Sequence, residues 1–270
     1  MTDAPGSNAP RLTALHVYPI KSTAGLAPLG WDVDGLGLRY DRRWMVVDGH
    51  GRMLTQRSHP RLARVRPSLG AGVLRIETDG MPALELPLDP SPAVSLPVSI
   101  WDDACVATWN GERASRWFSD VLDMDCSLVH VPENRARTVD PDYAPPGHRV
   151  GFADAFPFLL ISEASLADLN RRLQTPLPMN RFRPNLVIAG VEPFGEDRLG
   201  TFGIGRLRFA VVKPCDRCVV TTTDQETLER GPEPLRTLAT YRRSNGKVLF
   251  GQNLVHDGMG RLSVGDPLLV

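Results

Sequence analysis

Short apolar and β-branched runs, interrupted at close intervals by proline and glycine, dominate this sequence. The 270 residues include 24 prolines and 24 glycines. Such frequent interruption of short β-branched runs predicts an α+β protein that is mostly β. Residues 111–122 and 162–173 depart from the pattern, because their apolar side chains recur at helical spacing. We expect a helix in each, the second with Ser162 or Ser165 as its N-cap.

The composition is that of a globular protein with no dominant charge. Lys+Arg and Asp+Glu are both 31, so the formal net charge is zero. A balanced chain offers no global field to attract nucleic acid or an anionic membrane. We see no signal peptide and no apolar span long enough to cross a membrane. Four cysteines do not form a disulfide framework at this length, so we expect a cytoplasmic protein. We also expect residues 1–10 to form a disordered tail.

Several pairs of short runs predict β-hairpins. Residues 44–47 predict a buried strand that turns at 48–52 and returns at 53–57. Similar pairs lie at 74–78 with 83–88, at 94–101 with 104–108, and within 260–270. The polar, proline-rich residues 132–147 predict a long surface loop, which we interpret as a domain boundary or an active-site flap.

Two of the four cysteines, Cys215 and Cys218, form a C-x-x-C motif with Arg217 between them. An apolar run precedes the motif and a β-branched run follows it. The pattern predicts a strand, a sharp turn at Pro214 and a second strand. An adjacent guanidinium group favours the thiolate, which is the form that attacks or binds a metal.

Four interpretations of this pair stay open. A zinc site needs four ligands, but Cys105 and Cys126 are distant and single, with no histidine at ligand spacing. A thioredoxin-like redox pair is expected at the head of a helix, and here the flanks resemble strands. The third interpretation is two half-buried cysteines in a β-rich core. The pattern favours the fourth, a single thiolate that binds a soft metal or a metal-bearing cofactor.

Cationic side chains stand at the ends of several predicted strands. Lys21 and Ser22 could hold an anion, although these residues alone favour a solvated surface lysine. Arg42 follows Asp41, and could either pair with it or offer forked donors to a planar polar ligand. Another arginine and an asparagine, at positions 183 and 185, straddle a proline, so we expect both side chains on one side of an extended segment.

Taken in order, these motifs resemble those of MOSC-domain proteins that carry an N-terminal MOSC-associated β-barrel domain. The sequence is similar to the mitochondrial amidoxime-reducing components and their bacterial relatives. The matching stretches are Tyr-Pro-Ile-Lys-Ser at 18–22, Asp-Arg-Arg-Trp at 41–44, residues 159–170, Phe-Arg-Pro-Asn-Leu at 182–186, Pro-Phe-Gly-Glu-Asp at 193–197, residues 213–224, Phe-Gly-Gln-Asn at 250–253 and Val-Gly-Asp at 264–266. The resemblance implies a MOSC β-barrel with peripheral helices at 131–270, packed on a β-barrel-like domain at 11–130.

The resemblance also implies a molybdenum cofactor, in which molybdenum is bound to molybdopterin, and no pyridoxal phosphate. It makes Cys218, rather than Cys215, the metal ligand and a catalytic residue. Asp154 is a second catalytic candidate, as a proton donor near the metal. The implied cofactor-binding residues are Lys21, Ser22, Arg42, Arg183, Asn185, Asp216 and Arg217. For Lys21, this role replaces the interpretation as a solvated surface residue.

The implied reaction is the reduction of N-hydroxylated compounds, such as hydroxylamino bases and amidoximes, to the corresponding bases and water. Some relatives carry a C-terminal ferredoxin domain, and this chain shows no such cysteine cluster. We therefore expect a separate ferredoxin- or flavin-type electron donor, and no nucleic-acid or membrane partner. One alternative is a carrier of molybdenum cofactor or sulfur without turnover of its own. Another, a β-rich interaction protein without cofactor, is disfavoured by Cys218, Arg183 and Arg42.

Overall fold

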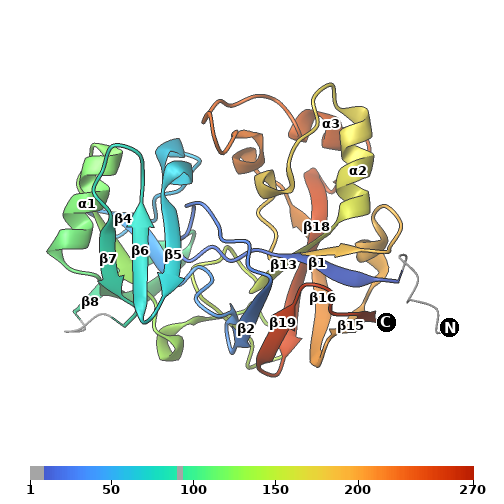
Figure 1. Cartoon of the computed structure of the whole chain (residues 1–270), viewed down its shortest axis with the longest axis horizontal. Coiled ribbons are helices and arrows are strands. Elements are labelled where there is room, and N and C mark those ends of the chain that lie inside the picture. Colours follow the sequence, from blue (N-terminus) through green and yellow to red (C-terminus); the bar gives the residue numbers. More distant parts are fainter. Residues whose placement is uncertain (1–8, 90–93) are drawn as a thin grey trace.

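The chain folds into two halves that lie side by side (Figure 1). A computed structural model describes residues 9–89 and 94–270, so the predicted tail at 1–10 lies outside the described residues except for its last two positions. The earlier half carries α1 (Glu112–Leu122), and the later half carries α2 (Glu163–Arg172) and α3 (Leu235–Ala239). Strands make up most of the regular structure, which confirms the predicted mostly β fold with peripheral helices.

The later half is built on one large sheet that nearly closes into a barrel. Its strands are β1 (Arg11–Leu15), β13 (Phe158–Ser162), β14 (Leu186–Ala189), β15 (Thr201–Ile204), β16 (Leu207–Asp216), β17 (Arg243–Ser244), β18 (Lys247–Asp257) and β20 (Leu268–Leu269). Their order is β1-β14-β13-β18-β16-β15-β20, with β17 beside β18. Backbone hydrogen bonds between residues 10–12 and 265–268 bring the two ends of this order together.

The first strands of the chain belong to the later half. In Figure 1, β1 lies across the sheet on the right, far from the sheets of the earlier half. Strand β2 (Gly30–Asp34) pairs with β3 (Gly37–Leu38) on one side and with β19 (Gly260–Ser263) on the other. Leu12, Leu15 and Val33 are buried in the same core as Phe158 and Phe209. The domain boundary at 130/131 stays a prediction, and residues 11–38 help to build the later half.

The earlier half contains two smaller antiparallel sheets. One has the order β4-β10-β9-β8, from β4 (Trp44–Asp48), β8 (Ser95–Ile100), β9 (Asp103–Trp109) and β10 (Cys126–His130). The other is β5 (Arg66–Gly70), β6 (Val73–Glu77) and β7 (Leu84–Pro87). The predicted helix at 111–122 is confirmed as α1, whose Ala114, Trp117, Phe118 and Leu122 pack into a core with Trp44.

Helix α2 confirms the second predicted helix and its cap. The Ser162 hydroxyl accepts a hydrogen bond from the Ser165 backbone N–H at 3.0 Å, which satisfies a donor in the first turn. Glu196 is fully buried and accepts from the Ser162 N–H and from the Ser165 hydroxyl. Five short 3-10 helices lie in the described residues, at Pro60–Arg64, Glu133–Arg135, Met179–Arg181, Gly195–Arg198 and Val219–Thr222. No helix in residues 9–89 or 94–270 is long and apolar enough to cross a membrane.

The structure corrects the prediction around the cysteine motif. Pro214 lies inside β16, beside an irregularity in its pairing with β18, and not in a turn. The expected second strand is wrong, because residues Val219–Thr222 form a 3-10 helix. The hydroxyls of Thr221 and Thr222 donate to the carbonyls three residues earlier, at 2.9 and 2.8 Å. Such local side-chain bonds favour a tight turn over an extended chain and override the β-branched pattern.

One predicted hairpin forms only in part, and another is wrong. After the turn at 48–52, Met53 forms an antiparallel bridge with Val47 and the Leu54 N–H donates to the Val46 carbonyl at 2.8 Å, but residues 53–57 form no continuous strand. Within 260–270, β19 pairs with β2 while β20 pairs with β15, because barrel closure offers each a partner from elsewhere in the chain. The loop at 132–147 includes β11 (Arg137–Thr138), which pairs with β12 (Arg149–Val150).

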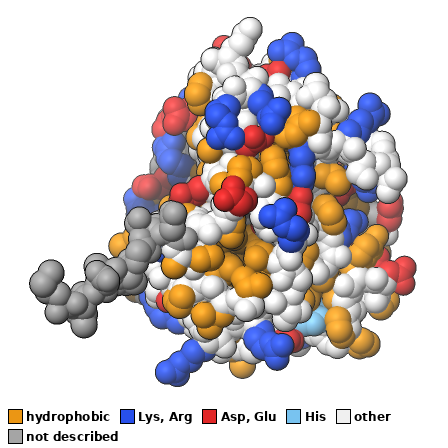
Figure 2. Space-filling model, turned by 90° about the vertical axis from the view of Figure 1, so that its right-hand side faces the viewer, with side chains coloured by type: hydrophobic (Ala, Val, Ile, Leu, Met, Phe, Trp, Pro, Cys, Tyr) orange, Lys and Arg blue, Asp and Glu red, His pale blue; other side chains and the backbone are white. Residues whose placement is uncertain are grey.

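Figure 2 shows the face at the right-hand side of Figure 1. Apolar side chains lie between basic and acidic ones there, and neither sign of charge gathers over a broad area.

A buried histidine predicts a specific loss of stability in mild acid. His130 is 7% exposed and stacks on Trp44 with 4.8 Å between ring centroids. Burial, aided by nearby Arg43, lowers the pKa of His130 from 6.5 to about 4. The unfolded chain therefore binds a proton that the folded chain refuses, and stability falls as pH drops from 6.5 towards 4. Over this window, denaturant titrations should show a loss about 3 kcal/mol larger in wild type than in His130→Gln, which keeps the smaller contributions of the other buried histidines His16 and His256. Parallel pH curves would contradict the prediction.

Candidate functional site

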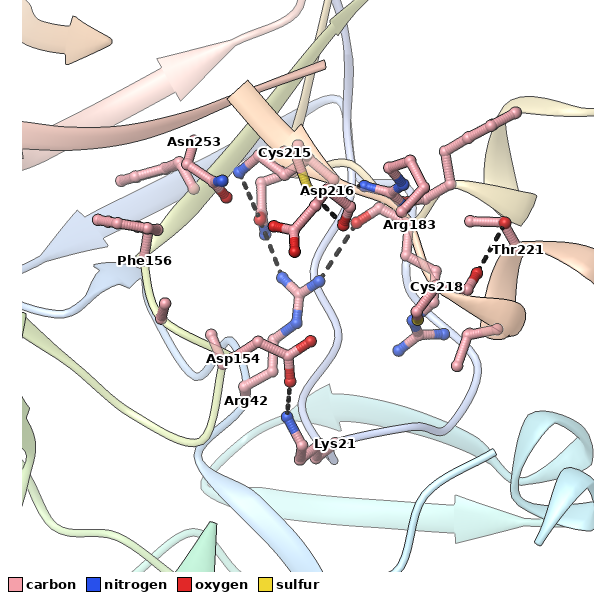
Figure 3. Close-up of a pocket in the computed structure, with 18 of the residues that line it drawn as sticks. Lys21, Arg42, Asp154, Phe156, Arg183, Cys215, Asp216, Cys218, Thr221 and Asn253 are labelled. Carbon is pink, nitrogen blue, oxygen red and sulfur yellow. Dashed lines mark hydrogen bonds and ion pairs between the residues drawn. The ribbon is translucent and has the colours of Figure 1, made fainter. Parts of the chain in front are cut away.

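Residues from both halves line one cavity of about 150 Å³. All nine predicted site residues lie in its wall, namely Lys21, Ser22, Arg42, Asp154, Arg183, Asn185, Asp216, Arg217 and Cys218. They come from segments that follow β1, precede β4, precede β13, precede β14 and end β16 (Figure 3). None of residues 132–147 lines this cavity, so the structure gives no support to the flap interpretation of that loop.

An ion pair joins Lys21 and Asp154 at the cavity wall (Figure 3). The Lys21 ammonium donates to the Asp154 carboxylate at 2.5 Å and to the Phe152 carbonyl at 2.8 Å. The lysine side chain is 7% exposed, whereas the aspartate side chain is 59% exposed. Burial lowers the pKa of Lys21, and its carboxylate partner only partly opposes this.

The same pair sets the protonation of Asp154. Burial alone would raise the pKa of its carboxyl, but the charges of Lys21 and then Arg57 outweigh burial and hold that pKa well below its usual range. In this arrangement Asp154 is ionised at neutral pH, and its carboxylate accepts hydrogen bonds. Its expected role as a proton donor stays a prediction, and it requires a change in the Lys21 contact.

Arg42 ties the two halves together through its guanidinium group. Its Nη1 donates to Asp41 Oδ2 at 2.5 Å and to Asn185 Oδ1 at 2.9 Å, and its Nη2 donates to the Arg183 carbonyl at 3.2 Å. Asp41 is buried, which raises the pKa of its carboxyl, while Arg42 opposes that rise. The Asn185 amide also donates to the His16 carbonyl at 3.2 Å. Arg42 and Asn185 thus line the cavity while their polar groups bond to protein.

Tyr18 holds two of the cavity arginines. The guanidinium carbons of Arg42 and Arg183 lie 4.3 and 4.1 Å from the centroid of its ring. Both arginines have left-handed backbones, with φ of 47° and 54°. A Cβ atom on Gly25 would lie 2.5 Å from a carbon of the Tyr18 ring, so this position has no room for a side chain. The electron-rich ring stabilises two cations that would otherwise repel each other.

The two cysteines have different arginine partners. Cys218 precedes the 3-10 helix Val219–Thr222, and its sulfur accepts a hydrogen bond from Arg57 Nη2 at 3.2 Å. The sulfur of Cys215 accepts from Arg217 Nη1 at 3.0 Å. Burial raises the pKa of the Cys215 thiol, and Arg217 only partly opposes this. Arg217, the arginine inside the motif, therefore contacts Cys215, which is not the expected metal ligand.

Asp216 and Arg217 are anchored to the protein as well as lining the cavity. Asp216 forms an ion pair with Lys247 at 3.1 Å, at the edge where both side chains are about half exposed. Arg217 Nη2 donates to the Phe182 carbonyl at 2.6 Å. Its Nε is buried and has no hydrogen-bond partner among the described residues. One donor of Arg217 is therefore left for a ligand or for water.

Two alternative interpretations of the cysteine motif lack what they need. In the part of the chain that the structure describes, no group of three or more histidine, cysteine or acidic side chains is placed to hold a metal ion. A zinc site of protein ligands alone is therefore not formed. The motif also stands before a four-residue 3-10 helix, not at the head of the α-helix that a thioredoxin-like pair requires.

Sequence reasoning missed three polar residues in the cavity wall, Arg57, Thr221 and Asn253. Thr221 and Asn253 lie in motifs quoted for the family resemblance, where they carried no role of their own. Arg57 gave no local signal, because its segment was expected to be an ordinary returning strand. Its position 161 residues before Cys218 hides the contact between them.

The wall of the cavity fits an anionic, metal-bearing cofactor. Five cationic side chains line it, against the two carboxylates Asp154 and Asp216; the cations are Lys21, Arg42, Arg57, Arg183 and Arg217. The Cys218 sulfur is a soft ligand of the kind that soft metals select.

A β-barrel with an adjoining β domain, and a cysteine-bearing cavity lined by both, defines the class of protein. Residues 9–125 match the MOSC N-terminal beta barrel domain, and residues 147–269 match the MOSC domain. The chain belongs to the MOSC-domain family.

Relatives with two different names match most of this chain. The chain is 36% identical over 273 residues to mitochondrial amidoxime-reducing component 1 of Mus musculus, covering 94% of this chain and 80% of the relative. The human protein of that name is 33% identical, with 94% and 81% covered. Molybdenum cofactor sulfurase of Arabidopsis thaliana is 34% identical over 269 residues, which is 91% of this chain but 33% of the relative. The chain thus spans about a third of that sulfurase.

Removing the carboxylate of Asp154 should destabilise the protein in a pH-dependent way. Above the ordinary aspartate pKa of 3.8, Asp154→Asn leaves the buried Lys21 ammonium without its counter-charge, so we expect a lower free energy of unfolding. As pH falls below 3.8, Asp154 takes up a proton in the unfolded chain while it stays ionised in the folded chain, so wild type loses this stability and the difference should shrink. Urea titrations across this range measure it. Asp142→Asn, at an exposed position outside the cavity, is the control. A difference that grew in acid would contradict the assigned pairing.

Proposed function

We propose that this protein is a molybdenum-dependent oxidoreductase that reduces N-hydroxylated compounds, such as hydroxylamino bases and amidoximes. The observation that carries the proposal is the position of the Cys218 sulfur in a cavity whose cationic side chains come from both halves of the chain. The relatives named amidoxime-reducing components, aligned over more than nine-tenths of this chain, support it.

Each residue would contribute according to its chemistry. The molybdenum cofactor, when bound, would supply the two-electron redox chemistry. Cys218 would provide the soft protein ligand to the metal. Lys21, Arg42 and Arg183 would hold the phosphate and the polar pterin. The remaining contacts of the cofactor would come from Ser22, Asn185, Asp216 and Arg217.

Asp154 would gain its protonating role through Lys21. In the structure, the Lys21 ammonium is the main charge that keeps the pKa of the Asp154 carboxyl low. A phosphate that drew this ammonium away would allow the pKa to rise, because the carboxylate would lose the main charge that lowers it. The carboxyl could then hold a proton and deliver it to a substrate oxygen that leaves as water.

The proposed reaction is R-NH-OH plus two electrons and two protons, giving R-NH2 and water. We propose that the electrons come from a separate ferredoxin- or flavin-type protein in the cytoplasm, with no nucleic acid or membrane involved. Five cationic side chains line the cavity and protein acceptors balance them only in part. The site would therefore suit the cofactor's anionic part rather than a cationic one.

A second candidate function is a carrier of molybdenum cofactor or sulfur without turnover of its own. The 34% identity to a molybdenum cofactor sulfurase favours this candidate. The two functions share a cofactor site and differ in whether reduced substrate appears.

Separate replacement of each cysteine by alanine tests the proposed function directly. Purified wild-type protein should contain molybdenum and, with an artificial electron donor, should convert benzamidoxime to benzamidine. Cys218→Ala should lose both properties, because the metal loses its protein sulfur. Cys215→Ala is the matched control and should keep most of both. Equal losses in the two variants would contradict the assignment of the ligand, and molybdenum retained by wild type without turnover would favour the carrier.

The cavity arginines should affect cofactor retention and stability differently. Arg183→Ala removes a cation whose hydrogen bond goes to the Thr23 carbonyl, so we expect a loss of molybdenum with little change in stability. Arg42→Ala also leaves Asp41 buried without its ion partner, and should lower the free energy of unfolding by about 3–5 kcal/mol. Elemental analysis and denaturant titration separate these effects. Arg198→Ala, at an exposed position, is the control. Full molybdenum content in Arg183→Ala would remove its assigned role.

A further inference from the structure

We propose that Arg57 is a positioning residue for the sulfur of Cys218, and that Trp101 holds Arg57 in place. The inference rests on the function proposed above, in which that sulfur binds the metal. It concerns two residues of the earlier half that reach the cysteine motif of the later half.

Arg57 lies between the sulfur and the carboxylate of the cavity. Its Nη2 donates to Cys218 Sγ at 3.2 Å and lies 3.9 Å from Asp154 Oδ2. The Arg57 side chain is 27% exposed, so water does not screen these contacts fully. Among the described residues, no other side chain donates a hydrogen bond to the Cys218 sulfur. One guanidinium therefore fixes the direction of the expected metal ligand.

Trp101 contacts both Arg57 and Asp154. The Arg57 guanidinium carbon lies 4.2 Å from the centroid of the indole ring. The indole N–H donates to Asp154 Oδ1 at 3.3 Å, on the carboxylate that also accepts from Lys21. Trp101 thus covers one face of the guanidinium and shares its carboxylate neighbour, which limits the rotamers open to Arg57.

The backbone of Trp101 indicates that its side chain is placed for a purpose other than core packing. It is the first of the two residues that join β8 to β9, and its φ is 53°. Glycine is preferred at such a turn position, and a bulky aromatic residue is strained there. The side chain is also 46% exposed, so burial does not compensate for the strain. Stacking on Arg57 accounts for an indole at this position.

Arginine suits the role in a way that lysine does not. A planar guanidinium can lie flat on an indole while its edge donates to a sulfur, whereas an ammonium acts as a single point charge. A hydrogen bond to a metal-bound thiolate stabilises negative charge on the sulfur, which raises the reduction potential of the centre and restrains the ligand. We therefore expect Arg57 to influence both metal retention and potential.

The experiment compares Arg57→Leu, Arg57→Lys, Trp101→Leu and Trp101→Phe with wild type, all purified as the full chain under conditions that load molybdenum. Arg61→Leu is the matched control, since Arg61 is exposed and outside the cavity. The readouts are molybdenum per chain after dialysis, the midpoint potential from EPR-monitored titration, and the melting temperature.

For Arg57→Leu, we expect molybdenum retention to weaken roughly tenfold, as for loss of one charge-assisted hydrogen bond, and the midpoint potential to become more negative. Arg57→Lys should recover only part of either loss. Trp101→Leu should shift the potential in the same direction, and Trp101→Phe, which keeps an aromatic face, should stay near wild type. If Arg57→Leu does not fold, the two Trp101 variants decide the question.

Wild-type retention and potential in both Arg57→Leu and Trp101→Leu would overturn the inference and leave the proposed function standing. So would a fall in melting temperature that accounts for all loss of metal, with an unchanged potential in the loaded fraction. A wild-type protein with neither molybdenum nor turnover would instead overturn the proposed function, before any variant is compared.

Discussion

The pairing of β1 with β14 is the constraint on which the site depends. This antiparallel ladder continues beyond β1, where the His16 N–H donates to the Asn185 carbonyl at 2.9 Å and the Asn185 side chain returns a bond to the His16 carbonyl. The pairing places Tyr18 and the Lys21–Ser22 pair beside residues far along the chain. Without it, the arginines at 42 and 183 would have no common ring to stack on, and the cavity would have no continuous wall.

Crowding cations around a cavity is unfavourable unless each has an acceptor, and the chain supplies one for almost all of them. The Lys21 ammonium has Asp154, Arg42 has Asp41, Arg183 has the Thr23 carbonyl and Arg217 has the Phe182 carbonyl. The cavity is therefore preorganised for an anion while it remains stable by itself. The acceptor most exposed to the cavity is Asp154, so its bond to Lys21 is the contact that a ligand exchanges most easily.

Local patterns in the sequence predict what local forces decide. Helical spacing identified α1 and α2, and the Ser162 cap followed from its side chain and its place before an apolar stripe. The motifs quoted for the family resemblance contain eight of the nine predicted residues that line the cavity, and the ninth, Asp154, lies outside those motifs. The sequence did not predict Arg57 as a site residue, because its contact with Cys218 depends on how the two halves meet and not on its neighbours in the sequence. Residues Val219–Thr222 were predicted as a strand for a different reason. Their threonine hydroxyls donate to backbone carbonyls, and these local bonds outweigh the β propensity of the same residues.

The two cysteines of the C-x-x-C motif both line the cavity, but their surroundings are unequal. The Cys215 thiol lies at the end of β16, where burial raises its pKa and Arg217, anchored on the Phe182 carbonyl, contacts its sulfur. Cys218 lies past the end of the strand, and a donor from the other half of the molecule contacts its sulfur. A dithiol or a zinc site requires two sulfurs facing a common centre with similar partners. Here separate arginines from separate halves contact the two sulfurs instead, and this asymmetry supports the proposed role of Cys218 as the single thiolate ligand.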